Sequence, residues 1–229
     1  NSNVPVNAKI GVDYYANDKH TFGILFNGNT QVVDKEYIST SRTNIYSQLS
    51  PTRIDSTLDA SNNIINHSYN ANVNLNYRFT DTIGNELSVD LDKGLFTATS
   101  TSMQPNRYIN GNTGEVTTRR DFTNNTPSNI DISTAKLDYT HTFKKSGLRL
   151  SSGGKYARVK TENTFDFFNL VDGSPIKDID QSNNFNYTEE VSALYLNLAG
   201  AKGKWNYQAG VRMENTHSIG DLRRDTSIT

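Results

Sequence analysis

The segment NANVNLNYRF at residues 70–79 decides the fold class of this chain. Apolar side chains occupy every second position, at Ala71, Val73, Leu75, Tyr77 and Phe79. The positions between them carry four asparagines and one arginine. Side chains alternate between the two faces of an extended strand, whereas an amphipathic helix repeats its apolar positions every three to four residues. The segment is therefore predicted to be a β-strand with one apolar and one polar face.

The same period of two recurs along the chain, and no segment keeps an apolar stripe at helical spacing. The further segments lie at residues 10–14, 22–26, 87–91, 135–139, 148–150, 194–198 and 205–213. The pattern predicts an all-β fold, an antiparallel up-and-down meander of about eight strands.

The connections between these strands alternate in length. Short polar turns are expected at residues 17–19, 81–85, 144–147 and 202–204. Long stretches rich in Asn, Ser, Thr and Asp are expected to be loops, at residues 33–66, 100–129 and 163–186. Short turns at one end and long loops at the other are typical of transmembrane β-barrels. The chain is therefore interpreted as a single partial barrel domain, residues 1–229, that forms a segment of a larger transmembrane β-barrel.

Large aromatic residues on the apolar face lie within a few residues of the short turns. They are Tyr14, Phe22, Tyr77, Phe79, Tyr139, Phe143, Trp205 and Tyr207. Amphipathic rings prefer the boundary between lipid and water, whereas a soluble core places its aromatics along the whole strand. These eight residues are predicted to form a membrane-interface girdle in contact with outer-membrane lipid.

The opposite face carries charged residues in the same strands, including Asp90, Asp92, Lys136 and Arg212. Burying an unpaired charge costs on the order of several kcal/mol, so this face cannot be the core of a sandwich. A barrel lumen removes that cost. A soluble sheet with one wet face removes it too, and alternation alone leaves both possibilities open.

The composition excludes several classes of function. The 229 residues include 23 basic and 24 acidic residues, so no basic surface for nucleic acid is expected. Cysteine is absent, and the four histidines show no metal-ligand spacing. No catalytic, phosphate-binding or dinucleotide-binding motif is present. We expect no enzyme activity, no metal and no cofactor.

The long polar stretches contain aromatic and basic residues that a barrel would present outside the cell. Aromatic rings can stack on the faces of a ligand, and arginines can bind its anionic groups. The candidate ligand-binding residues are Tyr37, Tyr46, Tyr108, Arg119, Arg120, Phe165, Phe167 and Phe168. The alternative is that these rings only pack the loops against one another.

Residues 189–216, EEVSALYLNLAGAKGKWNYQAGVRMENT, resemble a strand-turn-strand hairpin of TonB-dependent outer-membrane receptors, in particular the barrel family of Bacteroidetes-type bacteria. The segments NVNLNYRF and KLDYTHTF are similar to other strands of such barrels. These receptors have 22 strands and an N-terminal plug. The chain shows neither a plug, nor a signal peptide, nor a terminal strand that ends in an aromatic residue, so it is expected to be an internal piece.

The resemblance implies energised uptake of a siderophore, glycan or peptide across the outer membrane of a Gram-negative cell. The implied partners are the remaining strands and plug of the same barrel, an inner-membrane energy-coupling protein and a surface lipoprotein. Two alternatives stay open. One is a soluble or surface-anchored β-rich binding module, such as an adhesin that recognises carbohydrate or protein through its loops. The other is a passive porin or an assembly barrel.

Overall fold

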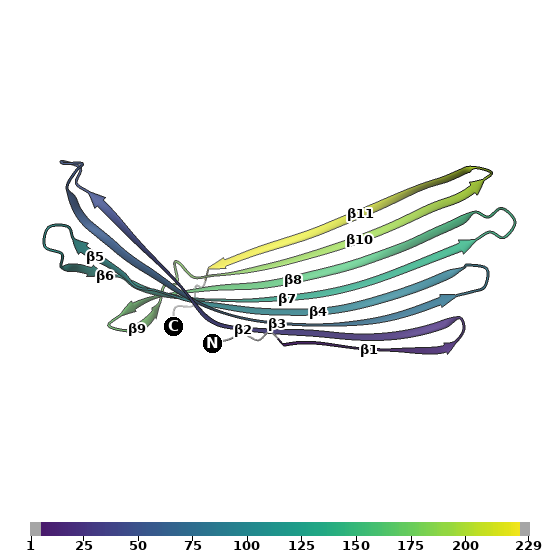
Figure 1. The fold of residues 1–229 in the computed structure, drawn as a ribbon, viewed down its shortest axis with the longest axis horizontal. Coiled ribbons are helices and arrows are strands. Elements are labelled where there is room, and N and C mark those ends of the chain that lie inside the picture. Colours follow the sequence, from purple (N-terminus) through teal and green to yellow (C-terminus); the bar gives the residue numbers. More distant parts are fainter. Residues whose placement is uncertain (1–5, 225–229) are drawn as a thin grey trace.

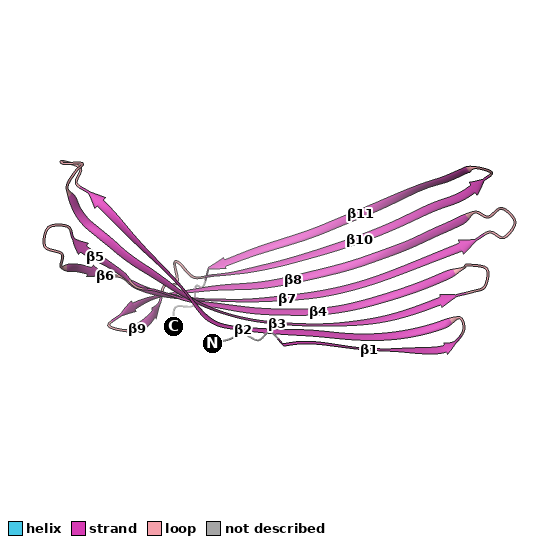
Figure 2. Ribbon diagram, viewed as in Figure 1, coloured by secondary structure: helices cyan, strands magenta, loops and turns pink. Residues whose placement is uncertain are grey.

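A computed structural model describes residues 6–224 of the chain, with the side chains of residues 31–37 excepted. Within this part there is no helix, and 11 strands form one antiparallel sheet (Figures 1 and 2). Eight long strands make the body of the sheet: β1 (Val6–Asn17), β2 (His20–Tyr46), β3 (Ile54–Thr80), β4 (Glu86–Gln104), β7 (Asp121–Thr142), β8 (Arg149–Val171), β10 (Asn183–Lys202) and β11 (Trp205–Arg224). Three short strands lie beside them: β5 (Asn106–Asn110), β6 (Val116–Arg119) and β9 (Ser174–Lys177).

The eight long strands are the eight that alternation predicted, and they lie side by side in chain order, β1-β2-β3-β4-β7-β8-β10-β11. The prediction of an antiparallel meander is confirmed. Figure 1 shows the hairpin turns gathered at one end of the sheet. Two of these turns have only two residues, and the β10–β11 turn places Gly203 at φ 61°, a conformation that glycine adopts readily.

The β3–β4 turn is held by the carboxylate of Asp81. One oxygen of Asp81 accepts the backbone N–H groups of Ile83 and Asn85, both at 2.8 Å, and the other accepts the Asn85 side-chain amide at 2.7 Å. Loss of hydration acts to raise the pKa of Asp81, but the hydrogen bonds from Asn85, Ile83 and Gly84 outweigh it and hold that pKa below its usual value. The residue types of this turn therefore specify it locally.

The expectation of long loops at the other end is wrong in its extent. β2 and β3 each run for 27 residues, and only residues 47–53 connect them. The stretch 100–129 contains the β5–β6 hairpin, with β5 paired to β3, and the stretch 163–186 contains β9, paired to β8. The extensions of β2 and β3 carry no apolar alternation, and their backbone hydrogen bonds hold them together without it. The period-of-two criterion therefore missed them.

The sheet has no interior of its own. Among the described residues, Ala193 is the only apolar residue that is buried. Leu75, Leu137 and Leu196 are each nearly half exposed although they lie in the middle of the apolar segments of their strands. β1 and β11 form the two free edges, and the sheet is not closed. An exposed apolar face of this extent requires contact with a further apolar surface.

Strand register shows that the apolar residues form a diagonal band. One cross-strand row contains Val12, Ile24 and Leu75, and the same row ends in Ser192 and Asn215 on β10 and β11. On β11 the apolar residues instead lie closer to the turn, at Trp205, Tyr207, Ala209, Val211 and Met213. The strands of a barrel are tilted by about 35–45° from the barrel axis. An apolar band that is level with the membrane therefore crosses the strands diagonally.

Candidate functional site on the inner face

The face that carries the apolar band is called the outer face, and the face that carries Asn70, Asn72, Asn74 and Asn76 is called the inner face. All eight predicted girdle residues lie on the outer face. They occupy the edge of the apolar band that is nearest the short turns. Tyr14, Phe22 and Tyr77 share one row, with the rings of Phe22 and Tyr77 4.9 Å apart. Trp205, at the other edge, is 80% exposed. Contact of this girdle with lipid remains a prediction.

In the part of the sheet whose outer face carries the apolar band, the inner face is polar. This region is called the polar wall, and it includes Asn74, Asp92, Lys136 and Arg212. Asn74 donates its side-chain amide to Asp92 at 2.8 Å and accepts the amide of Asn76 at 3.0 Å. Charged residues pair along their own strands, Lys136 with Asp138 at 2.6 Å and Arg212 with Glu214 at 2.6 Å. These groups stay partly exposed, so a water-filled space in front of them keeps their hydration and lets the charges persist.

Nearer the end with the strand extensions, the inner face changes from polar to aromatic. Strand register assigns five rings to this region, called here the inner aromatic cluster: Phe122, Phe165, Phe167, Phe185 and Tyr187. Lys155 on β8 belongs to the polar wall, because it pairs with Lys136. Phe165 and Phe167 come an even number of residues after Lys155, so they lie on the same face of the sheet. The ring of Phe167 lies 5.4 Å from that of Phe122 and 6.3 Å from that of Phe165. The rings of Phe185 and Tyr187 lie 6.4 Å apart.

The cluster also presents polar groups. The Tyr187 hydroxyl donates to Glu189 Oε2 at 2.6 Å, and the Ser128 hydroxyl donates to Asn163 Oδ1 at 2.6 Å. Pairing places Ser128 and Asn163 opposite each other, in the row that also contains Phe185. Rings with a few fixed hydrogen-bonding groups are the usual lining of ligand sites in proteins.

A tight turn after β9 holds Phe167 in place. The backbone N–H of Asp178 donates to the Phe167 carbonyl at 2.8 Å, and the Phe167 N–H donates to the Ser182 hydroxyl at 3.0 Å. Ser182 is only 1% exposed, and its hydroxyl also donates to the Asp178 carbonyl at 2.7 Å. The turn therefore fixes the backbone at the centre of the inner aromatic cluster.

The Asp178 carboxylate organises this turn. It accepts the backbone N–H groups of Asp180 at 3.1 Å and Gln181 at 3.2 Å, and the side-chain amides of Gln181 at 2.8 Å and Asn169 at 3.1 Å. The Gln181 side chain contributes most, and these hydrogen bonds together hold the pKa of Asp178 below its usual value.

The pKa of Asp178 is lower in the folded state than in the unfolded state. At any pH above the unfolded-state pKa, the ionised carboxylate therefore gives its full stabilisation to the turn. This stabilisation is lost as the pH falls through the folded-state pKa. We expect amide hydrogen exchange in residues 163–185 to be unchanged between about pH 5 and 8, once corrected for intrinsic rates, and to accelerate below about pH 4. Asp178→Ala should give the fast exchange already at pH 7. Asp178→Asn should exchange at an intermediate rate, because its amide oxygen still accepts the two backbone N–H groups.

The structure brings together only some of the predicted ligand-binding residues. Phe165 and Phe167 lie in the inner aromatic cluster, whereas Phe168 lies on the outer face, opposite Thr123 and Lys177. Tyr46 ends β2 and is 52% exposed, and the side chain of Tyr37 lies outside the described residues. Phe168 therefore lies apart from the inner aromatic cluster, since adjacent strand residues point to opposite faces.

The remaining predicted residues lie in the β5–β6 region. Tyr108 is part of β5, and Arg119 ends β6 with Arg120 directly after it. Arg119, Asp121 and Asp172 line a separate cavity of about 750 Å³. Binding of a ligand by any of these residues stays a prediction.

Sequence reasoning missed Phe122, Phe185 and Tyr187 as partners of Phe165 and Phe167. All three lie on the inner face of their strands. The period of two is present in FDF at residues 165–167 and FNY at residues 185–187, but the polar composition of residues 163–186 predicts a loop there. Extending the alternation past the apolar segments would have assigned these rings to one face.

No group of three or more His, Cys, Asp or Glu residues that could hold a metal ion occurs between residues 6 and 224. In the same part of the chain, no helix is long and apolar enough to cross a membrane.

Comparison with known proteins gave one result for the family. The model of the outer membrane protein beta-barrel family matches residues 78–229, which is about two thirds of the chain. The match begins near the end of β3 and includes the inner aromatic cluster and the β10–β11 hairpin. A search of curated proteins found no match.

Proposed function

The chain belongs to the outer membrane protein beta-barrel family and lies in the outer membrane, and from this premise we propose that it forms part of the wall of a receptor for energised solute uptake. The solute would be a siderophore, a glycan or a peptide. The proposal includes the partners of such a receptor, namely the rest of the barrel, a plug, an inner-membrane energy-coupling protein and a surface lipoprotein. It involves no covalent chemistry.

The inner aromatic cluster is the observation that carries this proposal. Barrel turns are short on the periplasmic side, so the strand extensions and the cluster lie toward the outside of the cell. A solute that arrives from outside would meet the rings of Phe122, Phe165 and Phe167 before it reaches the polar wall. Aromatic rings bind the flat faces of sugars and ring systems, and the hydroxyl and amide groups beside them add direction.

The polar wall below the cluster supports passage of a hydrated solute. Paired charges such as Lys136–Asp138 and Arg212–Glu214 keep this surface polar and close to neutral. Energy coupling rests on the resemblance of residues 189–216 to TonB-dependent receptors. Membership in an outer-membrane family favours this function over a soluble binding module.

Uptake by cells that carry single substitutions in the full-length protein tests the proposal. We expect Phe167→Ala to raise the half-saturating solute concentration about tenfold, which corresponds to about 1.4 kcal/mol of lost contact. Phe168→Ala is the matched control, because it removes the same ring from the next residue on the outer face. Ferric siderophores, oligosaccharides and peptides serve as the three probes, each as a sole source of iron or carbon.

Uptake should also stop when an uncoupler abolishes the proton gradient. Uptake that persists with the uncoupler would identify a passive pore and overturn energised transport. Equal effects of Phe167→Ala and Phe168→Ala would remove the inner aromatic cluster from the transport route.

A further inference from the structure

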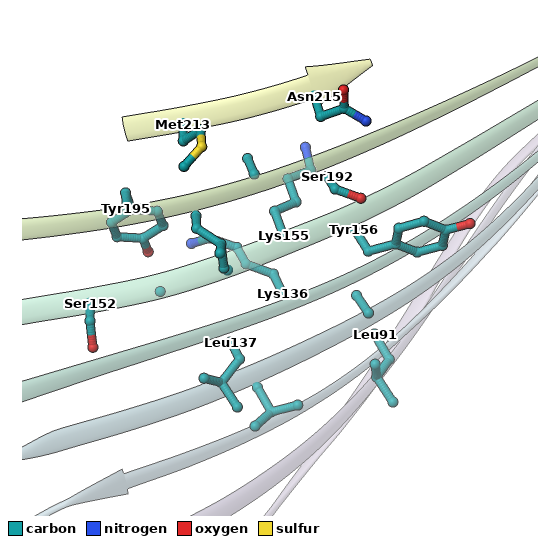
Figure 3. Close-up of a pocket in the computed structure, with 16 residues that line it drawn as sticks. Leu91, Lys136, Leu137, Ser152, Lys155, Tyr156, Ser192, Tyr195, Met213 and Asn215 are labelled. Atoms are coloured by element: carbon teal, nitrogen blue, oxygen red, sulfur yellow. The ribbon is translucent and has the colours of Figure 1, made fainter. Parts of the chain in front are cut away.

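The outer face of the sheet contains a hollow in the middle of the apolar band. Leu137, Gly154 and Leu194 are cross-strand neighbours in one row, and Gly154 has no side chain to fill the space between the two leucines. The hollow has a volume of about 930 Å³, and its lining is mostly apolar (Figure 3). The lining comes from five adjacent strands, β4, β7, β8, β10 and β11.

Small residues create this space. Ala135, Ser152 and Ser192 lie on the outer face around Gly154, and larger apolar side chains such as Leu91 and Met213 form the rim. Lys136 and Lys155 also border the hollow because they alternate with these residues along β7 and β8. Ligand pockets in proteins have volumes of roughly 300–1,000 Å³, so the hollow can hold one extended hydrocarbon chain.

Three cations lie on the same face, beyond the hollow toward the strand extensions. Lys93, Ser133 and Arg158 form one row, and Lys160 follows in the next row, paired with Asp131. The side chains of Lys93, Arg158 and Lys160 are each about half exposed, at 51%, 53% and 51%. The Lys93 ammonium contacts Asp131 and donates to the Ser133 hydroxyl at 3.0 Å. The cations therefore gather directly above the apolar band.

Each of these cations has a carboxylate partner that is itself exposed. Arg158 lies 3.4 Å from Glu190, and Lys160 lies 2.5 Å from Glu162. Exposed ion pairs contribute only about 0–1 kcal/mol, so a cation can turn toward a phosphate at little cost. Arginine can bind a phosphate group, as it binds a carboxylate, with two parallel hydrogen bonds.

The spacing of the two features matches one lipid leaflet. Arg158 is four positions after Gly154 on β8, about 13 Å along the strand, and a tilt of about 35–45° leaves about 10 Å of that distance across the membrane. The apolar band of an outer-membrane barrel is about 25 Å tall, so half of it is about 12 Å. A lipid with its phosphate at Arg158 would therefore reach the hollow with its acyl chain. The strand extensions are on the external side, so this lipid belongs to the external leaflet.

We propose that the outer face binds one lipopolysaccharide molecule of the external leaflet, with an acyl chain in the hollow at Gly154 and a lipid A phosphate at Arg158 and Lys160. The hollow and the cations are independent observations, and both lie on one face at the heights that a single phosphorylated glycolipid spans. The inference rests on the outer-membrane location and not on the solute that the receptor transports.

The test is the lipid content of the full-length protein purified from outer membranes in mild detergent. Mass spectrometry of the intact complex identifies the bound lipid by its mass. We expect about one lipopolysaccharide per protein molecule. The double variant Arg158→Gln/Lys160→Gln should reduce its occupancy at least fivefold, and Gly154→Leu should do the same by filling the hollow, since even a Cβ atom there would lie 3.1 Å from Leu194 Cδ2.

Matched controls lie on the inner face of the same sheet. Ala157→Leu adds bulk three residues from Gly154, and Arg212→Gln removes a cation, and both should retain the lipid. Heat-dependent gel mobility verifies that each variant is folded. If Gly154→Leu fails to fold, the double variant decides, since its substitutions are exposed. Absence of lipopolysaccharide, a phospholipid in its place, or equal occupancy in the double variant and the controls would overturn the proposal.

Discussion

Leu75→Arg is expected to block stable insertion of the full-length protein into the outer membrane. Leu75 lies on the outer face in the middle of the alternating segment 70–79 of β3, between Ile24 and Leu91, and is 46% exposed. An arginine on the lipid face at the bilayer midplane costs roughly 2–4 kcal/mol. Leu196→Arg on β10 should cost a similar amount. The measurement is the fraction of protein recovered in the outer membrane with heat-dependent gel mobility.

Asn74→Arg is the control for this prediction. Asn74 is adjacent to Leu75 but faces the polar wall, where its side chain bonds to Asp92 at 2.8 Å. An arginine there meets carboxylates and water, so insertion should stay close to that of the unsubstituted protein. Equal recovery of the Leu75 and Asn74 variants would contradict the assignment of the outer face to lipid.

Gly153→Val should lower the stability of the sheet more than substitution of an ordinary inner-face residue. Gly153 pairs with Tyr195, whose phenol ring covers it on the inner face. A Cβ atom at residue 153 would lie 2.4 Å from the Tyr195 hydroxyl and 2.7 Å from the Leu137 carbonyl oxygen. The ring can rotate away, but the carbonyl belongs to the β7–β8 pairing. We expect a loss of about 1–3 kcal/mol, the usual cost of overpacking, measured by urea unfolding in detergent or vesicles.

Two variants show whether the close approach is the cause. Gly94→Ala also adds a side chain to an inner-face glycine, but there the nearest atom is 3.5 Å away, so its stability should change little. Combining Gly153→Val with Tyr195→Ala should recover the part of the loss that comes from the ring. A Gly153→Val protein as stable as the Gly94→Ala protein would show that β8 has room at this position.

Most of the β-sheet body could be predicted from local pattern. The alternation in residues 70–79 and in its seven counterparts marks each strand that crosses the apolar band. The reason is that a strand in lipid must be apolar on one face, and a period of two records that requirement in every strand separately. Turn residues such as Asp81 and Gly203 likewise act on their immediate neighbours, so the short turns were predicted correctly.

The strand extensions could not be predicted in the same way. Residues 37–46 pair with residues 54–64 although neither segment alternates between apolar and polar. Backbone hydrogen bonds hold this pairing, and every residue except proline can make them. The composition of these segments, rich in Asn, Ser and Thr, is also that of loops, which is why they were interpreted as loops.

The amino-acid sequence by itself determined that this chain forms strands with one apolar and one polar face and short turns at one end. Those properties depend on each residue and its near neighbours. Only the tertiary structure decided which residues of different strands meet. Phe167 lies beside Phe122, and Arg158 lies beside Glu190, because of the register between strands. Register depends on the turn that joins two strands and on the match between the apolar faces of both, so a pattern read on one strand at a time does not show which residues meet across the pair.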